Sequence, residues 1–231
     1  IGEEPKMKTI ASYIASTAML LTLAGNSFAE VGLSMAFESS YYGISYVPGL
    51  YVGYEQYNRT VVPVGGVFRV SLKPIENIQL RFSVGKLVGK SSFEQKDILS
   101  LIYGGPDKGK LTVTETPIEL QLGFPVEVAK ECYIYLSFGG LFCHSKFIQK
   151  LHQEDEWTER EVQGTIWGVP VIFGVERQIF RHWELFGEYY FLFIGSIKAS
   201  WDIGDDHYEG ENGLSSKEAF RRVRIGLSYL F

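Results

Sequence analysis

The stretch that decides the fold runs from Ala219 to Phe231 and reads AFRRVRIGLSYLF. Large apolar side chains occupy every second position, with arginine, glycine and serine between them. Successive side chains of a β-strand point to opposite faces, so this alternation predicts a strand with one apolar and one polar face. The apolar set is Val223, Ile225, Leu227, Tyr229 and Phe231, and the polar set is Arg222, Arg224, Gly226 and Ser228.

The same alternation recurs upstream. The segments are His182–Ile194, Gly164–Glu176, Glu131–His144, Lys110–Phe124, Asn77–Gly89 and Val64–Lys73. In each, one parity is large and apolar, and the other mixes charged, amide and small residues. A soluble barrel hides its apolar residues inside, whereas a charged interior favours an apolar face that contacts lipid. We therefore expect an all-β fold, a closed antiparallel up-and-down transmembrane β-barrel.

The spacers between these segments alternate in length, which predicts the orientation of the barrel. Outer-membrane barrels have short periplasmic turns and long external loops. The short spacers are Lys73–Asn77, Pro125–Lys130 and Arg177–Arg181, and the long polar ones are Lys90–Gly109, Ser145–Gln163 and Gly195–Glu218.

The number of strands depends on the first one. Closure favours an even number, so at least one strand must precede Val64. Either Val31–Glu38 or Ile44–Tyr57 fits this role. We expect eight strands. The alternative is ten, with both segments spanning and one more strand from Phe93 to Tyr103.

The last strand also carries a motif. Arg224, Gly226, Tyr229 and Phe231 match the pattern polar-x-Gly-x-x-aromatic-x-aromatic. This terminus resembles that of small bacterial outer-membrane β-barrel proteins, of the OmpA transmembrane-domain, OmpX and OmpW types. Residues 49–57 likewise resemble the first strand of the OmpA domain. The resemblance implies an outer-membrane location and implies that the four residues are the signal read by the barrel-assembly machinery.

The amino terminus is typical of a secretory signal peptide. Met7-Lys8 forms a short basic head, residues 18–24 an apolar centre, and Ser27-Phe28-Ala29 a small-x-small cleavage site. We expect cleavage between Ala29 and Glu30. Residues 1–29 would then be upstream residues plus the signal peptide, and residues 30–231 one barrel domain exported to the bacterial outer membrane.

Composition excludes other classes of protein. A net charge of −5 argues against a nucleic-acid partner, which calls for a clustered basic surface. A helical membrane protein needs a run of about 20 apolar residues, and the mean hydropathy is close to zero at +0.01. Cys132 and Cys143 have opposite parity on one expected strand, too far apart for a disulfide.

Charges on the polar parity should meet inside the barrel. Eight strands enclose a space that side chains fill, and a buried charge must be paired. We predict an interior charge network with pairs Arg81–Glu119 and Arg224–Glu188, to which Glu55 could add. Its members are Arg69, Arg81, Glu119, Glu184, Glu188, Arg222 and Arg224.

No catalytic centre is predicted. Outer-membrane lipid A deacylases use His-x-Ser on a lipid-facing strand, but His144 is followed two residues later by Lys146, and Ser145 has the opposite parity. We expect no enzyme activity, no cofactor and no metal. Acidic clusters in two long spacers are interpreted as solvated loops: Glu154, Asp155, Glu156, Glu159 and Glu161, and Asp202, Asp205, Asp206, Glu209 and Glu211.

These observations predict a non-enzymatic barrel with a structural or surface-interaction role in the envelope. The alternative is a narrow channel of the OmpW type for ions or small apolar molecules, and the third hypothesis is a lipid A-modifying enzyme. The expected partners are outer-membrane lipid and lipopolysaccharide, which Arg221 and Lys217 could contact at the external rim, and the assembly machinery during insertion. We expect a monomer.

Overall fold

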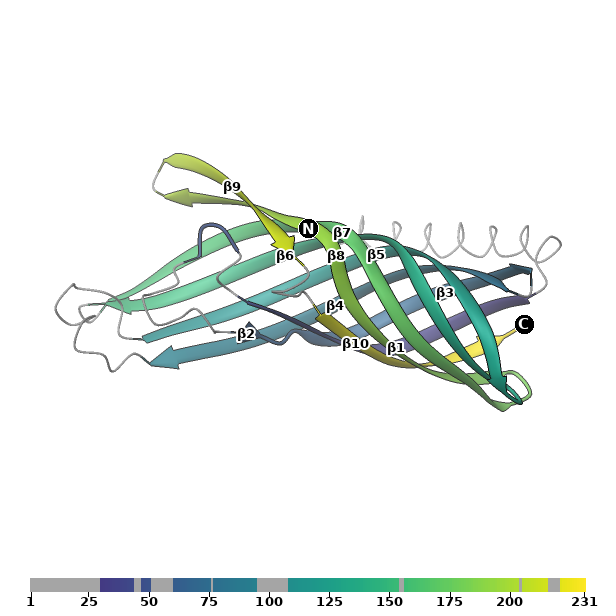
Figure 1. The fold of residues 1–231 in the computed structure, drawn as a ribbon. Helices are drawn as coiled ribbons and strands as arrows, with labels where there is room; N and C mark the ends of the chain where they lie inside the picture. The colour runs from purple at the N-terminus through teal and green to yellow at the C-terminus, as the bar shows by residue number, and fades with distance from the viewer. Residues whose placement is uncertain are drawn as a thin grey trace, which may run out of the picture.

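The strands of this protein pair antiparallel around a ring (Figure 1). The computed structural model describes residues 30–43, 47–50, 60–75, 77–94, 108–153, 156–203, 205–215 and 221–231. Its strands are β1 (Glu30–Gly43), β2 (Thr60–Val61), β3 (Val64–Ile75), β4 (Ile78–Glu94), β5 (Lys108–Ala129), β6 (Cys132–Gln153), β7 (Glu156–Phe180), β8 (Trp183–Ile203), β9 (Asp206–Ser215) and β10 (Arg221–Leu230). Among the described residues, no helix is long and apolar enough to cross a membrane.

The ring closes where the last strand meets the first. β10 pairs with β1 on one side, with Met35 opposite Leu227, and with β8 on the other, with Arg224 opposite Glu188. The eight ring strands are β1, β3, β4, β5, β6, β7, β8 and β10. The prediction of an eight-stranded all-β barrel is confirmed, and the ten-stranded alternative is wrong.

The first strand is β1, which contains the Val31–Glu38 candidate. The competing candidate Ile44–Tyr57 is wrong where it can be judged, because residues 47–50 form turns. Residues 51–57, with Glu55, lie outside the described residues, as do residues 1–29, predicted to be upstream residues plus a signal peptide, most of the Phe93–Tyr103 candidate, and Lys217.

Short turns join the strands at one end of the barrel, where the carboxyl terminus also lies (Figure 1). They lie at the carboxyl ends of the three predicted short spacers, whose earlier residues belong to strands. Glu131 takes a φ of 59° in the turn between β5 and β6. The amide of Phe231 donates to the carbonyl of Val31, 2.9 Å away, which fixes the last residue beside β1.

The outer face of this end is apolar. Leu120 is 61% exposed, Phe138 45%, Phe173 53% and Ile225 58%, so these side chains do not share a core. The inward neighbours on the same strands, such as Glu119 and Ser137, are buried. A band of exposed large apolar residues around a charged interior is the arrangement of a barrel whose solvent is hydrocarbon.

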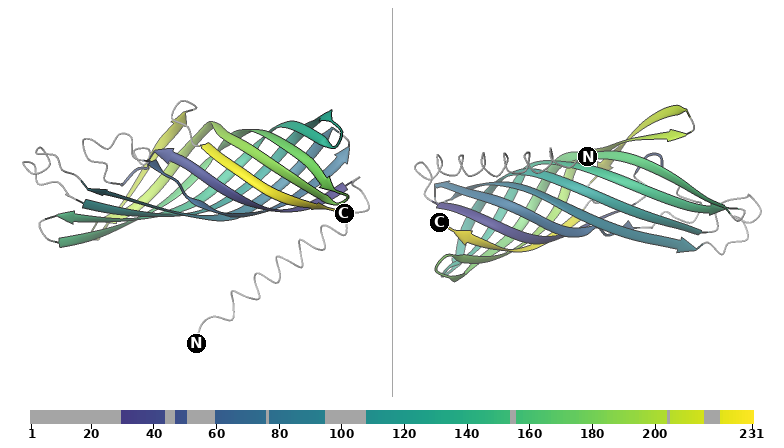
Figure 2. Two further views of the ribbon diagram at one scale, coloured as in Figure 1. Left: turned by 90° about the horizontal axis from the view of Figure 1, so that it is seen from below. Right: turned by 180° about the vertical axis from the view of Figure 1, so that it is seen from behind.

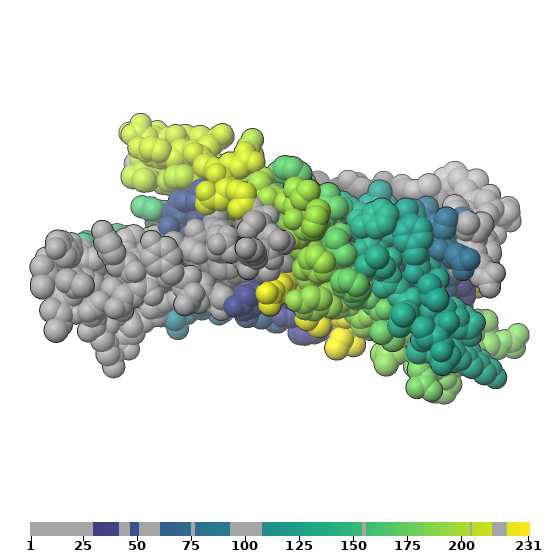
Figure 3. Space-filling model, in the orientation of Figure 1, coloured from purple at the N-terminus to yellow at the C-terminus, as the bar shows by residue number. Residues whose placement is uncertain are grey.

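Several strands continue far past this apolar band. β7 has 25 residues, and β5 and β6 have 22 each, whereas about 9–11 residues span a bilayer. The spacers Ser145–Gln163 and Gly195–Glu218 are therefore largely strand rather than loop, which corrects the prediction. The hairpin of β8 and β9 stands away from the barrel body (Figures 2 and 3).

The polarity of the two faces inverts where the strands leave the apolar band: the inward face becomes apolar and the outward face polar. On β5, Glu119 faces inward and Leu120 outward, but further along Val113 is fully buried inside and Lys110 is exposed. On β6, Ser137 lies inside and Phe138 outside, whereas further along Phe147 lies inside. The outer solvent has changed from lipid to water, so the apolar side chains have moved to the interior.

Candidate functional site

The lumen at the level of the apolar band is filled by charged side chains, which we call the charged layer. Its four arginines are each at most 1% exposed and come from three strands of the ring. They are Arg69 on β3, Arg81 on β4, and Arg222 and Arg224 on β10. The buried carboxylates that face them are Glu38 on β1, Glu115 and Glu119 on β5, Glu176 on β7 and Glu188 on β8.

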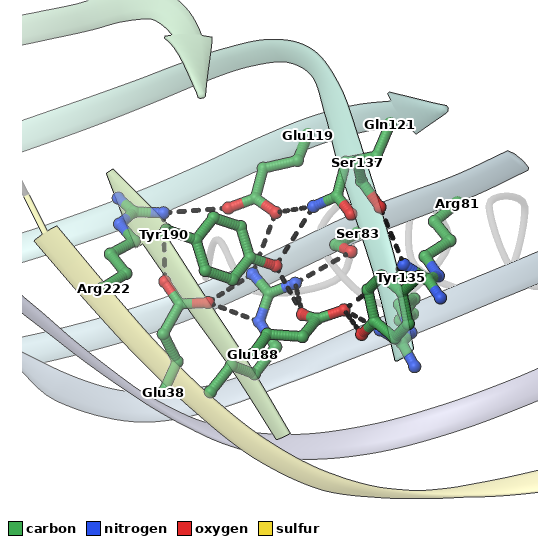
Figure 4. Close-up of polar contacts among 12 residues, drawn as sticks. Glu38, Arg81, Ser83, Glu119, Gln121, Tyr135, Ser137, Glu188, Tyr190 and Arg222 are labelled. Carbon is green, nitrogen blue, oxygen red and sulfur yellow. Dashed lines mark hydrogen bonds and ion pairs between the residues drawn. The ribbon is translucent and has the colours of Figure 1, made fainter. Parts of the chain in front are cut away.

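Glu188 is one centre of this layer (Figure 4). Its carboxylate accepts hydrogen bonds from Arg69 at 2.5 Å and from the hydroxyls of Tyr135 at 2.5 Å and Tyr190 at 2.6 Å. Arg224 approaches the same carboxylate at 3.4 Å and Arg81 at 3.7 Å. One glutamate thus binds groups from five strands, β3, β4, β6, β8 and β10, and ties them together across the lumen.

Glu119 and Glu38 form a second centre, also drawn in Figure 4. Arg222 lies 3.0 Å from each of these carboxylates, and Arg224 lies 2.9 Å from Glu119 and donates two hydrogen bonds to Glu38. The amide nitrogen of Gln121 donates to Glu119 at 2.7 Å and approaches the Tyr190 hydroxyl at 3.1 Å. The two centres therefore share Arg224 and Tyr190 and form one network.

Aromatic rings cover the flat faces of the arginines. Arg69 lies 3.7 Å from the ring centre of Phe186, Arg81 lies 3.7 Å from that of Tyr135, and Arg224 lies 4.8 Å from that of Tyr190. Such cation–π contacts are strongest where water is excluded. The stacking therefore stabilises the arginines in addition to their ion pairs.

Gly174 and Gly226 are the cross-strand partners of Tyr135 and Phe186. A Cβ atom at Gly174 would lie 2.0 Å from the Tyr135 ring, and one at Gly226 would lie 2.4 Å from the Phe186 ring. These two positions therefore require glycine for the rings to lie flat under the arginines.

The structure places the seven predicted interior residues as follows. Arg69, Arg81, Glu119, Glu188, Arg222 and Arg224 lie in the charged layer, and Glu184 lies nearer the short turns, 3.7 Å from Lys73. Arg224 does contact Glu188. The predicted Arg81–Glu119 pair is wrong, because Arg81 binds Glu176 at 2.7 Å whereas Glu119 binds the two β10 arginines.

Three carboxylates of the layer were missed: Glu38, Glu115 and Glu176. Glu38 and Glu176 were the last residues of segments with the correct inward parity. All three could have been found by assigning every charged residue of the inward parity in each segment to the lumen.

Above the charged layer the lumen is apolar, and we call this part the apolar layer. Inward residues of the extended strands pack there against residues 47–50 and Val61, which lie over them. Its members are Val47, Leu50, Val61, Leu111, Val113, Leu141, Cys143, Phe147, Val162, Ile166, Leu192, Ile197 and Ala199, with Trp201 packed against them. Cys143 is thus a core residue, and neither it nor Cys132 is in a disulfide.

Of the four motif residues of the last strand, Tyr229 and Phe231 lie at the end with the short turns, whereas Arg224 and Gly226 lie at the level of the charged layer. Tyr229 packs edge-on against Trp183 at 5.0 Å and against Phe231 at 5.0 Å, and Phe231 is 70% exposed. These rings form an aromatic cluster at one edge of the band, and Trp167 lies toward the other edge. Tyr189 lies between Phe173 and Val223 within the band. Reading of the motif by the assembly machinery stays a prediction.

The histidines and the described members of the acidic clusters lie outside the barrel, and Glu154 and Asp155 are not among the described residues. His144 is on the outer face, and Ser145 is fully buried on the inner face, so the two point to opposite sides of β6. On the β8–β9 hairpin, His207 lies 2.7 Å from Asp202 and 3.7 Å from Glu209. The hydrogen bond to Asp202 raises the pKa of His207 above its ordinary value. Within the described part of the chain, no group of three or more histidine, cysteine, aspartate or glutamate residues could hold a metal ion.

Several solved structures are similar to this chain. Over 89% of this chain and 97% of the other, the structure is similar to the outer-membrane protein OprG from Pseudomonas aeruginosa, with 13% identity and a TM-score of 0.55. A major outer-membrane protein from Thermus thermophilus matches at 11% identity and a TM-score of 0.49, covering 87% and 99% of the two chains. Ail of Yersinia pestis matches at 11% identity and a TM-score of 0.41, covering 87% of this chain and 98% of the other.

No protein-family model and no curated protein sequence matches the chain. The ring of strands, its apolar outer band and the likeness to OprG define the class of protein. The chain is an outer-membrane β-barrel protein with eight strands in the ring.

Proposed function

We propose that this protein is a closed, non-enzymatic barrel of the OmpA transmembrane-domain, OmpX and OmpW type that acts through its external surface. The observation that carries the proposal is the charged layer: its four arginines, from β3, β4 and β10, are at most 1% exposed. A water-filled pore through this level would leave them wetted. Lipopolysaccharide, the other lipids of the membrane, and the assembly machinery during insertion are the partners we propose for a monomeric barrel.

Energetics supports a lumen that stays shut. Opening a path past Glu188 would separate it from Arg69 and from the hydroxyls of Tyr135 and Tyr190. Removing one partner from a buried ion pair costs about 3–5 kcal/mol. Thermal opening of such a layer is therefore rare, and the structure is built for rigidity.

The second candidate is a narrow channel for small apolar molecules. The apolar layer favours it, because a buried apolar space at the external end would accept such a molecule if residues 47–50 moved aside. The charged layer beneath would then block passage straight down the lumen.

Planar-bilayer recording separates the two candidates. We expect refolded wild-type protein to give no stepwise conductance in concentrated KCl. The double variant Arg224→Ala/Glu188→Ala removes one centre and the arginine that joins it to the other, and it should conduct. Regular conductance steps from the wild type would overturn the proposal. Heat-modifiable migration on gels verifies that each sample is folded.

A further inference from the structure

Lysines gather on the outer faces of β4, β5 and β6 just beyond the apolar band. All are exposed or half-buried, and all lie on three adjacent strands of the ring. We call this surface the lysine face, and its members are Lys86 and Lys90 on β4, Lys108 and Lys110 on β5, and Lys146 and Lys150 on β6.

The strand register brings these side chains together. Lys110 lies directly opposite Lys150, and Lys90 lies opposite Thr112. Thr114 is the partner of Lys146. Like charges directly opposite each other destabilise a sheet, so the Lys110–Lys150 pair favours a bound anion between them. The threonines add hydroxyl donors between the ammonium groups.

The protein neutralises only part of this charge. Lys146 pairs with Glu161 and Lys150 with Glu159, each at 2.7 Å. Lys110 lies 5.3 Å from the ring centre of Trp157. Among the described residues, Lys86, Lys90 and Lys108 form no ion pair, which leaves the face positive.

The strands that follow the lysine face around the external region carry acidic side chains. The outer faces of β7 and β9 carry Glu159, Glu161, Glu209 and Glu211, all of them exposed. Glu159 and Glu161 border the lysine face and pair with Lys150 and Lys146, whereas Glu209 and Glu211 lie further away on β9. An anionic ligand would be attracted to β4 and β5, where Lys86, Lys90 and Lys108 form no ion pair with a described residue.

The lysine face continues directly into lipid-facing surface on the same strands. Phe82 on β4 is 47% exposed, Ile118 on β5 41% and Phe142 on β6 50%, and all three share the outward parity of the lysines. A ligand that matches both regions has acyl chains below and anionic groups above.

We propose that the lysine face binds the phosphorylated headgroup of a lipid in the outer leaflet, with its acyl chains on the apolar surface below. A soluble sulfated polysaccharide would pair with the lysines, but it has no acyl chains to contact the apolar surface below them. The inference rests on the proposed surface role and assigns the residues that bind the lipid partner.

Lipid binding by purified, refolded protein tests the proposal. The probes are lipid A carrying two phosphates and the same lipid after dephosphorylation, and native mass spectrometry in detergent measures their affinities. The variant is Lys86→Gln/Lys90→Gln/Lys110→Gln. A matched control removes three exposed cations elsewhere, in Lys130→Gln/Arg181→Gln/Lys198→Gln.

Each lysine near an anionic membrane surface contributes about fivefold to binding, so the triple variant should bind the phosphorylated lipid roughly 100-fold more weakly. The control variant should bind like the wild type, and dephosphorylated lipid should bind all three proteins equally. Equal loss in both variants, or no loss in either, would overturn the proposal.

A heparin tetrasaccharide provides the other source of anionic groups. If it bound as tightly as the phosphorylated lipid and lost its binding in the same variant, the ligand would be a polysaccharide and the lipid assignment would be wrong. Bilayer conductance is measured separately, so a conducting wild type would overturn the proposed closed barrel whatever the lipid result.

Discussion

The charged layer and the apolar layer of the lumen lie on the same strands, but different interactions stabilise them. In the charged layer, Glu188 is held by ion pairs and hydrogen bonds that cross the lumen, from Arg69 on β3 and Tyr135 on β6. In the apolar layer, Phe147 and Ile166 are held by packing within a cluster of buried side chains. The outer surface has the opposite character at each level, apolar around the charges and polar around the apolar cluster.

This difference teaches that the solvent outside decides the character of the inside. At the level of the band, lipid surrounds the barrel and apolar side chains are as stable outside as inside, so the interior is left to polar groups. Beyond the band, water surrounds the strands and the hydrophobic effect directs apolar side chains inward. The point of inversion on each strand therefore marks the membrane surface.

Replacement of Glu188 by alanine should have the largest effect on stability. Arg69 and Arg224 would keep their charge in a dry layer without this partner, at a cost of about 3–5 kcal/mol. Urea unfolding of protein in micelles, followed by tryptophan fluorescence, measures the free energy of unfolding.

The matched control is Glu159→Ala. Glu159 pairs with Lys150 on the surface, where both side chains are about half exposed at 53% and 52%. Such pairs contribute about 0–1 kcal/mol. Equal losses in the two variants would mean that water reaches the charged layer.

Replacement of Ile166 by alanine tests the apolar layer. This side chain is 1% exposed, and truncation of a buried isoleucine costs about 2–5 kcal/mol because a cavity remains. Ile118→Ala is the control: Ile118 is 41% exposed in the apolar band, where lipid chains can fill the space. We expect its loss in free energy of unfolding to be smaller. A larger loss for Ile118→Ala than for Ile166→Ala would contradict the assignment of lipid to the level of the apolar band.

Gly226→Ala should disturb the charged layer from the side. The added Cβ would lie 2.4 Å from the Phe186 ring and 2.6 Å from the carbonyl oxygen of Met35. Overpacking of this kind costs about 1–3 kcal/mol. Gly187→Ala is the control, since a Cβ there meets no atom within 4 Å. If unfolding experiments gave both variants the stability of the wild type, the Arg69–Phe186 stacking would not constrain the barrel.

The smallest expected effect concerns His207, outside both layers. Its pKa is raised by Asp202, so the stabilisation from this pair is fully present below the unfolded pKa of about 6.5 and is lost as pH rises through the folded pKa. Titration followed by NMR should give a lower His207 pKa in Asp202→Asn. Glu209→Gln, at a distance of 3.7 Å, should change it less. An unchanged pKa in Asp202→Asn would contradict the geometry.

The sequence was sufficient to predict the barrel, its parity and its turns, because alternation and spacer length are local signals. Arg224 and Glu188 could be placed in the lumen for the same reason. The partner of Arg81 could not be predicted, because it is Glu176 on β7, and barrel tilt and stagger decide which carboxylate a β4 arginine reaches.

The apolar layer was missed for a different reason. Leu111, Phe147 and Val162 alternate with polar residues, but in the opposite sense to the apolar band. If apolar side chains are assumed to face outward along the whole strand, such segments resemble polar loops. The inversion is visible in the sequence only if two different outer solvents are allowed along one strand.

The most direct test of this account follows one face of β5 across the proposed membrane surface. Single nitroxide labels at Leu120, Ile118, Thr114 and Lys110 report contact with oxygen, which is concentrated in lipid, and with a water-soluble nickel chelate. We predict that oxygen dominates at the first two positions and the nickel chelate at the last two. Lipid contact that persists to Lys110, or nickel access at Leu120, would contradict the claim that the inversion marks the membrane surface.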